Sequence, residues 1–182
     1  SKVNRNEKVL LDDLFFDVFN KSKIIHEKTS GHFDPSIGIL LDYAGFGPKK
    51  NENIISQDSL NIILSTVGFD KVEIVDRQIK KLNYRTKLDF NAIAKGYAVD
   101  VISEFLNSKS INDYMVDIGG EIRSSGKNHF KDMSWSIAID NPLPDRVDDK
   151  FYTRIKLQNA AIATSGNYRN FRVDSATGKK YV

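Results

Sequence analysis

The chain has 182 residues, of which 40% are hydrophobic and 28% are charged, as is usual for a globular protein with a core. It contains no cysteine, which excludes disulfides, thiolate catalysis and thiolate-bound metals. The formal net charge is only +3 and the basic residues are scattered, so the composition does not indicate a nucleic-acid-binding protein.

Helices are expected in the first part of the chain, because apolar residues recur there at helical spacing. The expected helices cover residues 12–30, 34–44 and 57–66. Asp12, Asp34 and Ser56 are the expected N-caps, since Asp and Ser side chains accept hydrogen bonds from the first free N–H groups of a helix. Gly31 and the turn at 45–48 are expected to end the first two helices, and a polar loop is expected over 49–56.

The pattern changes to that of short strands after residue 70. Strands are expected over 72–75, 79–82 and 85–90, followed by a helix over 91–107. Five further strands, expected to form one mostly antiparallel sheet, cover 114–118, 120–124, 135–139, 152–157 and 160–164. The order of helices, strands, helix and strands predicts an α+β fold.

The last residues predict a hairpin with arms at 171–174 and 180–182 around a turn at 175–178. Domains rarely end in the middle of a strand, so the chain is expected to be a fragment. An exposed loop is also expected over 140–150, which has two prolines and many aspartates.

The most informative segment is Asp-Phe-Asn-Ala-Ile-Ala-Lys-Gly-Tyr-Ala-Val-Asp at 89–100. It places Asp89, a run of small residues and Lys95 at the expected start of a helix, where free N–H groups and the helix dipole favour an anion. Lys95 would add a positive charge, so the pattern favours a phosphate or pyrophosphate. Two simpler alternatives stay open: Asp89 only caps the helix, and Lys95 is an exposed helix lysine. The segment is neither a P-loop nor a dinucleotide fingerprint.

Three other segments place glycine beside polar or aromatic residues at the expected ends of elements. They cover residues 30–47, 115–122 and 161–169. Glycine suits a backbone that approaches another group closely or has a positive φ. In the last segment, Thr164 and Ser165 offer two hydroxyls that suit a flavin edge or a phosphate, although a plain turn is an open alternative.

Taken together and in this order, the four segments resemble the ApbE family, the FAD:protein FMN transferases. The family patterns are G-x-F-D-P-T-x-G with W-G-F-G, D-x-x-x-I-A-K-G-Y-x-V-D, V-x-x-G-G-E and A-T-S-G-x-Y-R. Residues 1–5 also resemble the end of the family's S-x-x-S-x-x-N segment. The resemblance implies one ApbE-like (T-fold-like) domain over 1–182, with flanking helices on a mostly antiparallel sheet, incomplete at both termini.

The resemblance also implies a flavin site. The expected FAD-binding residues are Ala44, Gly45, Phe46, Asp89, Lys95, Thr164 and Ser165. The backbone carbonyl of Ala92 would bind Mg²⁺, a hard cation that prefers oxygen ligands. Mg²⁺ and Lys95 would neutralise the pyrophosphate as AMP leaves.

This chain departs from the family pattern in two respects. The family's loop tryptophan is Ala44 here, so ring stacking is expected to move to Phe46 or Tyr43. The family's basic histidine and its later metal ligands find no match and are expected beyond Val182. No catalytic residue is therefore assigned, and these residues alone are expected to be inactive.

The implied activity is the Mg²⁺-dependent transfer of FMN from FAD to a Thr or Ser hydroxyl of a client protein, a respiratory or redox flavoprotein subunit. The alternatives are an FAD pyrophosphatase and a non-catalytic flavin-binding protein. The resemblance implies a periplasmic or cell-envelope lipoprotein, attached to the membrane by an anchor upstream of Ser1. Residues 1–182 contain no apolar run of membrane-spanning length and no signal peptide.

Overall fold

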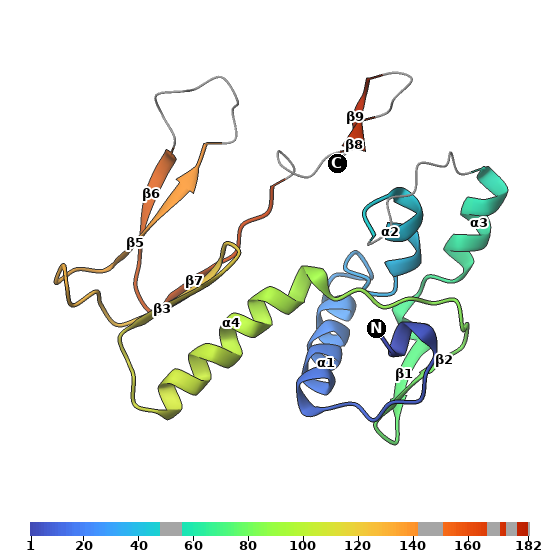
Figure 1. Cartoon of the computed structure of the whole chain (residues 1–182), viewed down its shortest axis with the longest axis horizontal. Helices are drawn as coiled ribbons and strands as arrows, with labels where there is room; N and C mark the ends of the chain where they lie inside the picture. Colours follow the sequence, from blue (N-terminus) through green and yellow to red (C-terminus); the bar gives the residue numbers. More distant parts are fainter. Residues whose placement is uncertain (48–55, 142–150, 167–171, 174–177, 182) are drawn as a thin grey trace. The chain divides into compact units, whose positions relative to one another are not determined.

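The computed structural model describes residues 1–47, 56–141, 151–166, 172–173 and 178–181 (Figure 1). The chain divides into two compact units, Ser1–Ala94 and Lys95–Val182. Both contain helical residues and antiparallel strand pairs, which confirms the α+β prediction. The expectation of a single domain over 1–182 stays a prediction.

The first unit contains the helices that precede α4 and one β-hairpin. Its elements are η1 (Val3–Arg5), α1 (Asp13–Lys28), α2 (Gly38–Ala44), α3 (Gln57–Ser65), η2 (Phe69–Lys71), β1 (Val72–Val75) and β2 (Gln78–Lys81). Two predicted caps are confirmed: the Asp12 side chain accepts from Phe15 N at 2.7 Å, and the Ser56 hydroxyl accepts from Ser59 N at 3.2 Å. The expected loop over 49–56 lies outside the described residues except for Ser56.

The core of the first unit joins α1 to the hairpin and to the segment before α4. Its buried members are Val3, Leu11, Phe19, Phe69, Val72 and Leu88. The rings of Phe19 and Phe69 lie 4.9 Å apart, and those of Phe15 and Phe90 meet edge to face at 5.6 Å. The predicted apolar face of α1 therefore fixes the segment that leads to Asp89.

The prediction that Asp34 caps the second helix is wrong, because α2 begins only at Gly38. The Asp34 carboxylate instead accepts from Ser36 N at 2.7 Å and from Phe69 N at 3.3 Å. The buried Ser36 hydroxyl in turn accepts from Gly68 N at 2.7 Å. Asp34 therefore builds a turn that ties this loop to η2, and its carboxylate is not available as a helix cap.

The prediction of a strand over 85–90 is also wrong, although this segment makes one isolated β-bridge. Lys87 makes a single parallel bridge with Ile37, and the neighbouring Gly38 N donates to Lys87 O at 3.0 Å. The Asn4 side chain bonds both backbone groups of Leu88, at 2.8 Å each. Because one partner is a side chain and the other a loop, no strand ladder can form.

The second unit holds most of α4 and the remaining strands. Its elements are α4 (Asn91–Ser108, whose first residues belong to the first unit), β3 (Tyr114–Ile118), β4 (Glu121–Ser125), β5 (Trp135–Asp140), β6 (Phe151–Leu157), β7 (Ala160–Ile162), β8 (Arg172–Val173) and β9 (Lys180–Tyr181). The predicted long helix is confirmed, as is the terminal hairpin, whose arms β8 and β9 pair antiparallel. Of its turn the structure describes only Gly178.

The five central strands do not form the single sheet that was predicted. Within the described residues, β3, β4 and β7 form one antiparallel sheet, and β5 pairs only with β6 (Figure 1). All residues of β6 except Leu157 are exposed, so that strand has no apolar face that must be buried against a larger sheet. The expected loop over 140–150 lies largely outside the described residues.

Asp113, just before β3, fastens the loop that follows β4. Its carboxylate accepts from Lys127 N at 2.7 Å and lies 2.8 Å from His129 Nε2. The bond from Lys127 N, followed by the bond from His129, lowers the pKa of Asp113. Since the folded pKa lies below the unfolded value of about 4, this carboxylate stabilises the fold above that pH.

We expect Asp113→Asn to lower the melting temperature at about pH 7 and to have a shrinking effect as the pH falls through the lowered pKa. Asp132→Asn, which removes an exposed carboxylate from the same loop, is expected to have little effect at either pH. Thermal unfolding at neutral pH and below pH 3 measures both. A deficit of Asp113→Asn that stays constant with pH would contradict the assignment.

Candidate functional site

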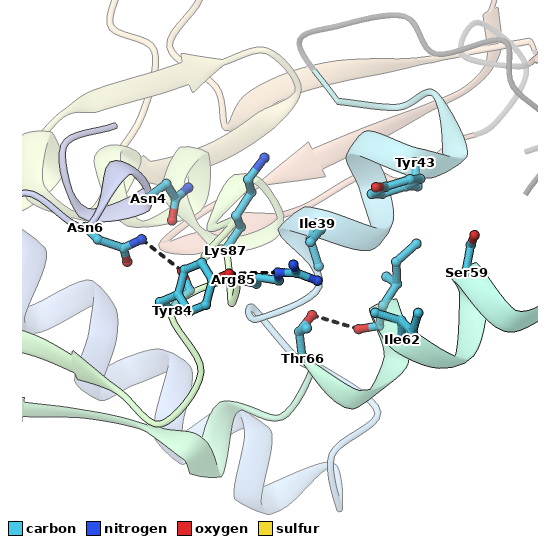
Figure 2. Close-up of a pocket in the computed structure, with 11 residues that line it drawn as sticks. Asn4, Asn6, Ile39, Tyr43, Ser59, Ile62, Thr66, Tyr84, Arg85 and Lys87 are labelled. Atoms are coloured by element: carbon cyan, nitrogen blue, oxygen red, sulfur yellow. Dashed lines mark hydrogen bonds between the residues drawn. The ribbon is translucent and has the colours of Figure 1, made fainter.

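The first unit contains a pocket between α2, α3 and the segment that follows β2. Its volume is about 560 Å³, within the range of roughly 300 to 1,000 Å³ usual for ligand sites. Figure 2 shows Ile39 and Tyr43 of α2, Ile62 and Ser59 of α3, and Tyr84 and Arg85 around it. The lining residues are Asn4, Asn6, Ile39, Tyr43, Ser59, Ile62, Ile63, Thr66, Tyr84, Arg85 and Lys87.

The cations of this pocket already have partners. Lys87 Nζ lies 2.6 Å from Asp42 Oδ2, and the Arg85 guanidinium lies 5.7 Å from the centre of the Tyr84 ring. Arg85 Nε also donates to the Tyr84 hydroxyl at 3.2 Å. An aromatic ligand could therefore meet tyrosine faces here and keep its polar groups near a guanidinium.

The predicted flavin loop at 44–46 forms the end of α2. Gly45 has φ +81° and its N–H points back to the helix, donating to Asp42 O at 3.3 Å. Phe46 N donates to Leu41 O at 3.0 Å, and the Phe46 side chain is 46% exposed. The loop is therefore a glycine-capped helix end that presents an aromatic ring to solvent, directly after the pocket residue Tyr43.

Asp89 acts as a local cap at the start of α4. Its carboxylate accepts from Asn91 N at 2.8 Å and from Asn91 Nδ2 at 3.0 Å, and its own N–H donates to Pro35 O at 2.7 Å. These bonds give Asp89 a structural role at the start of α4, and its contact with FAD stays a prediction. Ala92 lies exposed in the first turn of α4, one residue beyond Asn91.

Lys95 lies against the turn between β3 and β4 in the second unit. Its ammonium donates to Gly119 O at 3.2 Å and lies 2.6 Å from Glu121 Oε2. The Lys95 side chain is 48% exposed, whereas that of Glu121 is only 17% exposed. The ammonium is thus partly balanced by a carboxylate and does not bring a full extra charge.

Thr164 reaches the same turn from the end of β7. Its hydroxyl donates to Gly120 O at 3.4 Å, and Asp117 Oδ1 accepts from Gly120 N at 3.0 Å. The structure therefore brings together Lys95 and Thr164, from two of the predicted segments, at the glycine turn of a third. Ser165 follows Thr164 in an exposed stretch outside the strands.

A second ion pair joins α4 to β4. Arg123 Nη1 lies 2.7 Å from Asp100 Oδ1, and this hydrogen bond raises the pKa of Arg123. Glu121 and Arg123 stand two apart on β4, and Lys95 and Asp100 stand five apart on α4. The sequence analysis assigned no role to Glu121 or Arg123. An acid and a base at alternate positions of a strand, directly after two glycines, could have indicated paired charges on one face of that strand.

Comparison with known proteins identifies the chain. The ApbE family model matches residues 1–182. The chain belongs to the ApbE family. Its relatives include the FAD:protein FMN transferase of Vibrio cholerae, 37% identical over 144 residues, which are 79% of this chain and 42% of the relative. The FAD:protein FMN transferase of Haemophilus influenzae is 32% identical over 172 residues, 92% of this chain and 49% of that protein.

A solved structure confirms the ApbE fold. The crystal structure of the ApbE protein from Thermotoga maritima matches with a TM-score of 0.81 and 32% sequence identity. The match covers 99% of this chain and 58% of that chain. The family resemblance inferred from four short segments is thus correct, and this ApbE chain spans about half the length of the curated relatives it matches.

Proposed function

We propose that this ApbE chain binds FAD and belongs to an enzyme that moves FMN from FAD to a client protein, releasing AMP. Relatives that carry the name FAD:protein FMN transferase support the proposal. The observation that carries it is the gathering of Lys95, the Gly119-Gly120 turn and Thr164, which come from three separated segments, at one end of a sheet. The Lys95 ammonium, the rotatable Thr164 hydroxyl and a glycine backbone that allows close approach suit a diphosphate.

The transfer needs a simple exchange at one phosphorus. The oxygen of a Thr or Ser hydroxyl on the client forms a bond to the phosphorus of the FMN half. The bond from that phosphorus to the oxygen of AMP breaks, and the hydroxyl proton passes to a base. Lys95 would hold a phosphate oxygen and stabilise the negative charge that grows on AMP. The base is not assigned to any residue described here.

Mg²⁺ is the proposed companion of FAD. The carbonyl of Ala92 is an oxygen donor of the type Mg²⁺ accepts, and the phosphates of FAD would supply further oxygens. The described residues contain no group of three or more His, Cys, Asp or Glu side chains that could hold a metal. Ala92 therefore fits as one ligand among several, and the bound ion would supply positive charge beside the phosphates.

We further propose that aromatic side chains at the end of α2 contact the flavin ring. Tyr43 and the exposed Phe46 replace the stacking surface that Ala44 lacks, and Tyr43 lines the pocket beside α2. Gly45, in the left-handed region between them, lets the loop turn without a side chain in the way. Asp89, Thr164 and Ser165 remain proposed FAD contacts.

We further propose that the client is a redox or respiratory flavoprotein subunit and that the protein acts at the cell envelope, attached to the membrane. Both points rest on the family resemblance. None of the helices in the described part of the chain has the length and apolar character that a membrane span requires.

The deciding experiment titrates the full-length protein that contains residues 1–182 with FAD, with and without Mg²⁺, and follows flavin fluorescence. A client domain with an acceptor threonine is then added, and AMP and in-gel flavin fluorescence are measured. FAD binding with AMP and labelled client supports the transferase. AMP without label points to a pyrophosphatase, binding without AMP points to a flavin-binding protein, and no binding refutes the proposed site.

Lys95→Ala is expected to raise the Kd for FAD at least about tenfold, because a hydrogen bond to a charged phosphate contributes roughly 1.5 to 3 kcal/mol and about 1.4 kcal/mol is a factor of ten. Lys127→Ala is the matched control. Lys127 is also 48% exposed and is also paired with a carboxylate, that of Asp132, but in the loop after β4. Fluorescence titration measures both variants, and an unchanged Kd for Lys95→Ala would remove Lys95 from the site.

A further inference from the structure

Glu121 occupies an unusual position for a carboxylate at a proposed phosphate site. It is the first residue of β4, its side chain is 17% exposed, and its Oε2 lies 2.6 Å from Lys95 Nζ. Among the described residues, no further hydrogen bond to this buried Oε2 accompanies the ion pair. The ion pair with Lys95 is therefore the polar contact that compensates this carboxylate oxygen.

The ammonium of Lys95 keeps donor capacity in this arrangement. It has three N–H groups, of which one donates to Gly119 O at 3.2 Å. A second N–H faces Glu121 Oε2 at 2.6 Å, so one N–H is left for a ligand, and the Lys95 side chain is still 48% exposed. Fixing a freely rotating lysine side chain costs about 2 kcal/mol of rotamer entropy. A lysine that is already fixed before the ligand binds loses less entropy on binding.

The second ion pair fixes the helix against the strand. Five residues along a helix rise about 7.5 Å and two residues along a strand about 6.7 Å, so Lys95 and Asp100 match Glu121 and Arg123 in spacing. Along α4 the base precedes the acid, and along β4 the acid precedes the base, so Lys95 pairs with Glu121 and Asp100 pairs with Arg123. If α4 slid by this distance along β4, Lys95 would meet Arg123, and like charges would oppose that register.

We infer that Glu121 is a positioning residue that fixes the Lys95 ammonium over the Gly119-Gly120 turn, where it meets a phosphate of FAD. This inference rests on the proposed function for its ligand. The positioning role and simple electrostatics predict opposite changes in FAD affinity when the Glu121 carboxylate is removed. Coulomb's law alone says that loss of a carboxylate beside the site strengthens the binding of an anion, whereas loss of a positioning group weakens it.

The first test needs no flavin. A brief treatment with an amine-acetylating ester, followed by peptide mass spectrometry, gives the ratio of labelling at Lys95 to that at Lys127. The two lysines have equal exposure, but Asp132 is 80% exposed where Glu121 is 17% exposed. We expect Lys95 to react more slowly in the wild type and at the rate of Lys127 in Glu121→Gln.

The second test measures FAD affinity by fluorescence. Glu121→Gln is expected to raise the Kd about fivefold, equivalent to about 1 kcal/mol. The double variant Lys95→Ala/Glu121→Gln is expected to bind no more weakly than Lys95→Ala, because Glu121 acts through Lys95. Arg123→Gln, which removes the other ion pair of the same helix and strand, is expected to lower the melting temperature and to change the labelling ratio less than Glu121→Gln does.

The outcomes separate the inference from the function on which it rests. Tighter or equal FAD binding by Glu121→Gln, additive losses in the double variant, or a labelling ratio that Glu121→Gln does not change would each overturn the positioning role. If the wild type binds no FAD, the proposed function fails, and the labelling ratio alone then decides whether Glu121 fixes Lys95.

Discussion

Replacing Gly38 with alanine is expected to lower the free energy of unfolding of the first unit by about 2 to 3 kcal/mol, the upper range for overpacking in a close-packed interior. A Cβ on Gly38 would lie 2.8 Å from Lys87 O and 3.1 Å from Lys87 C. Both are backbone atoms, so no side-chain rotation relieves the contact. The bond from Gly38 N to Lys87 O, now 3.0 Å, would lengthen with it.

The consequences reach the pocket, because Lys87 lines it and pairs with Asp42 of α2. Gly96→Ala is the matched control. Gly96 is also helical, but in the described part of the chain nothing lies within 4 Å of the position that its Cβ would take. Alanine is the better helix former by roughly 1 kcal/mol, so this control is expected to be neutral or stabilising.

Urea unfolding followed by circular dichroism gives the change in stability of both variants. Hydrogen exchange, measured on peptides that cover residues 37–44 and 84–90, shows whether the loss of stability lies at this contact. Faster exchange in those peptides for Gly38→Ala, with none for Gly96→Ala, is the expected result. A Gly38→Ala protein as stable as the wild type would show that α2 can move away from Lys87 at little cost.

The contact at Gly38 also explains where prediction from the sequence failed. The segment 85–90 has the alternation of a strand, but its partners are the Asn4 amide and the turn at Ile37. Such pairing joins residues far apart in the chain, and no local pattern reports it. Asp34-Pro35 likewise has the local form of a helix start, yet the Asp34 carboxylate is bonded to Ser36 and Phe69.

Local rules worked where the local interaction decides the structure. Asp12 and Ser56 cap their helices as expected, because a cap needs only the next three residues. Helix α4 was predicted from its apolar spacing, and the hairpin of β8 and β9 from its turn residues. The family resemblance succeeded for a different reason, since it used four segments in order instead of any one of them.

The sequence pointed to Lys95 and Thr164, which the structure brings to one turn, but it did not predict the charges around Lys95. The sequence indicated Lys95 as a phosphate ligand with a full positive charge, and the structure pairs it with Glu121. The partner lies on a strand beyond the whole length of α4, so only the fold brings them together. Asp89, expected to contact the flavin, is bonded to Asn91 in the first turn of α4.

Replacing Gly120 with alanine is expected to disturb the fold and the proposed phosphate site together. Gly120 has φ +93°, which residues with a side chain rarely adopt, and such strain costs on the order of 1 to 3 kcal/mol. A Cβ there would also lie 2.9 Å from Thr164 Oγ1. The Thr164 side chain can rotate, but only by giving up its bond to Gly120 O.

Gly178→Ala separates the two effects. Gly178 has φ +66°, but no atom of the described residues lies within 4 Å of the position that its Cβ would take, so this control carries backbone strain without the steric contact. Both variants are expected to lower the melting temperature. Only Gly120→Ala is expected to weaken FAD binding, by about tenfold if one bond to a charged phosphate is lost.

A third substitution shows whether the effect of Gly120→Ala passes through Thr164. Thr164→Ala removes the hydroxyl that the new Cβ would displace, so Gly120→Ala should cost less stability in the Thr164→Ala background than in the wild type. Thermal melts and FAD titrations of the four proteins measure this coupling. Equal costs in both backgrounds would mean that backbone strain alone accounts for Gly120, and that Thr164 packs there without any part in the site.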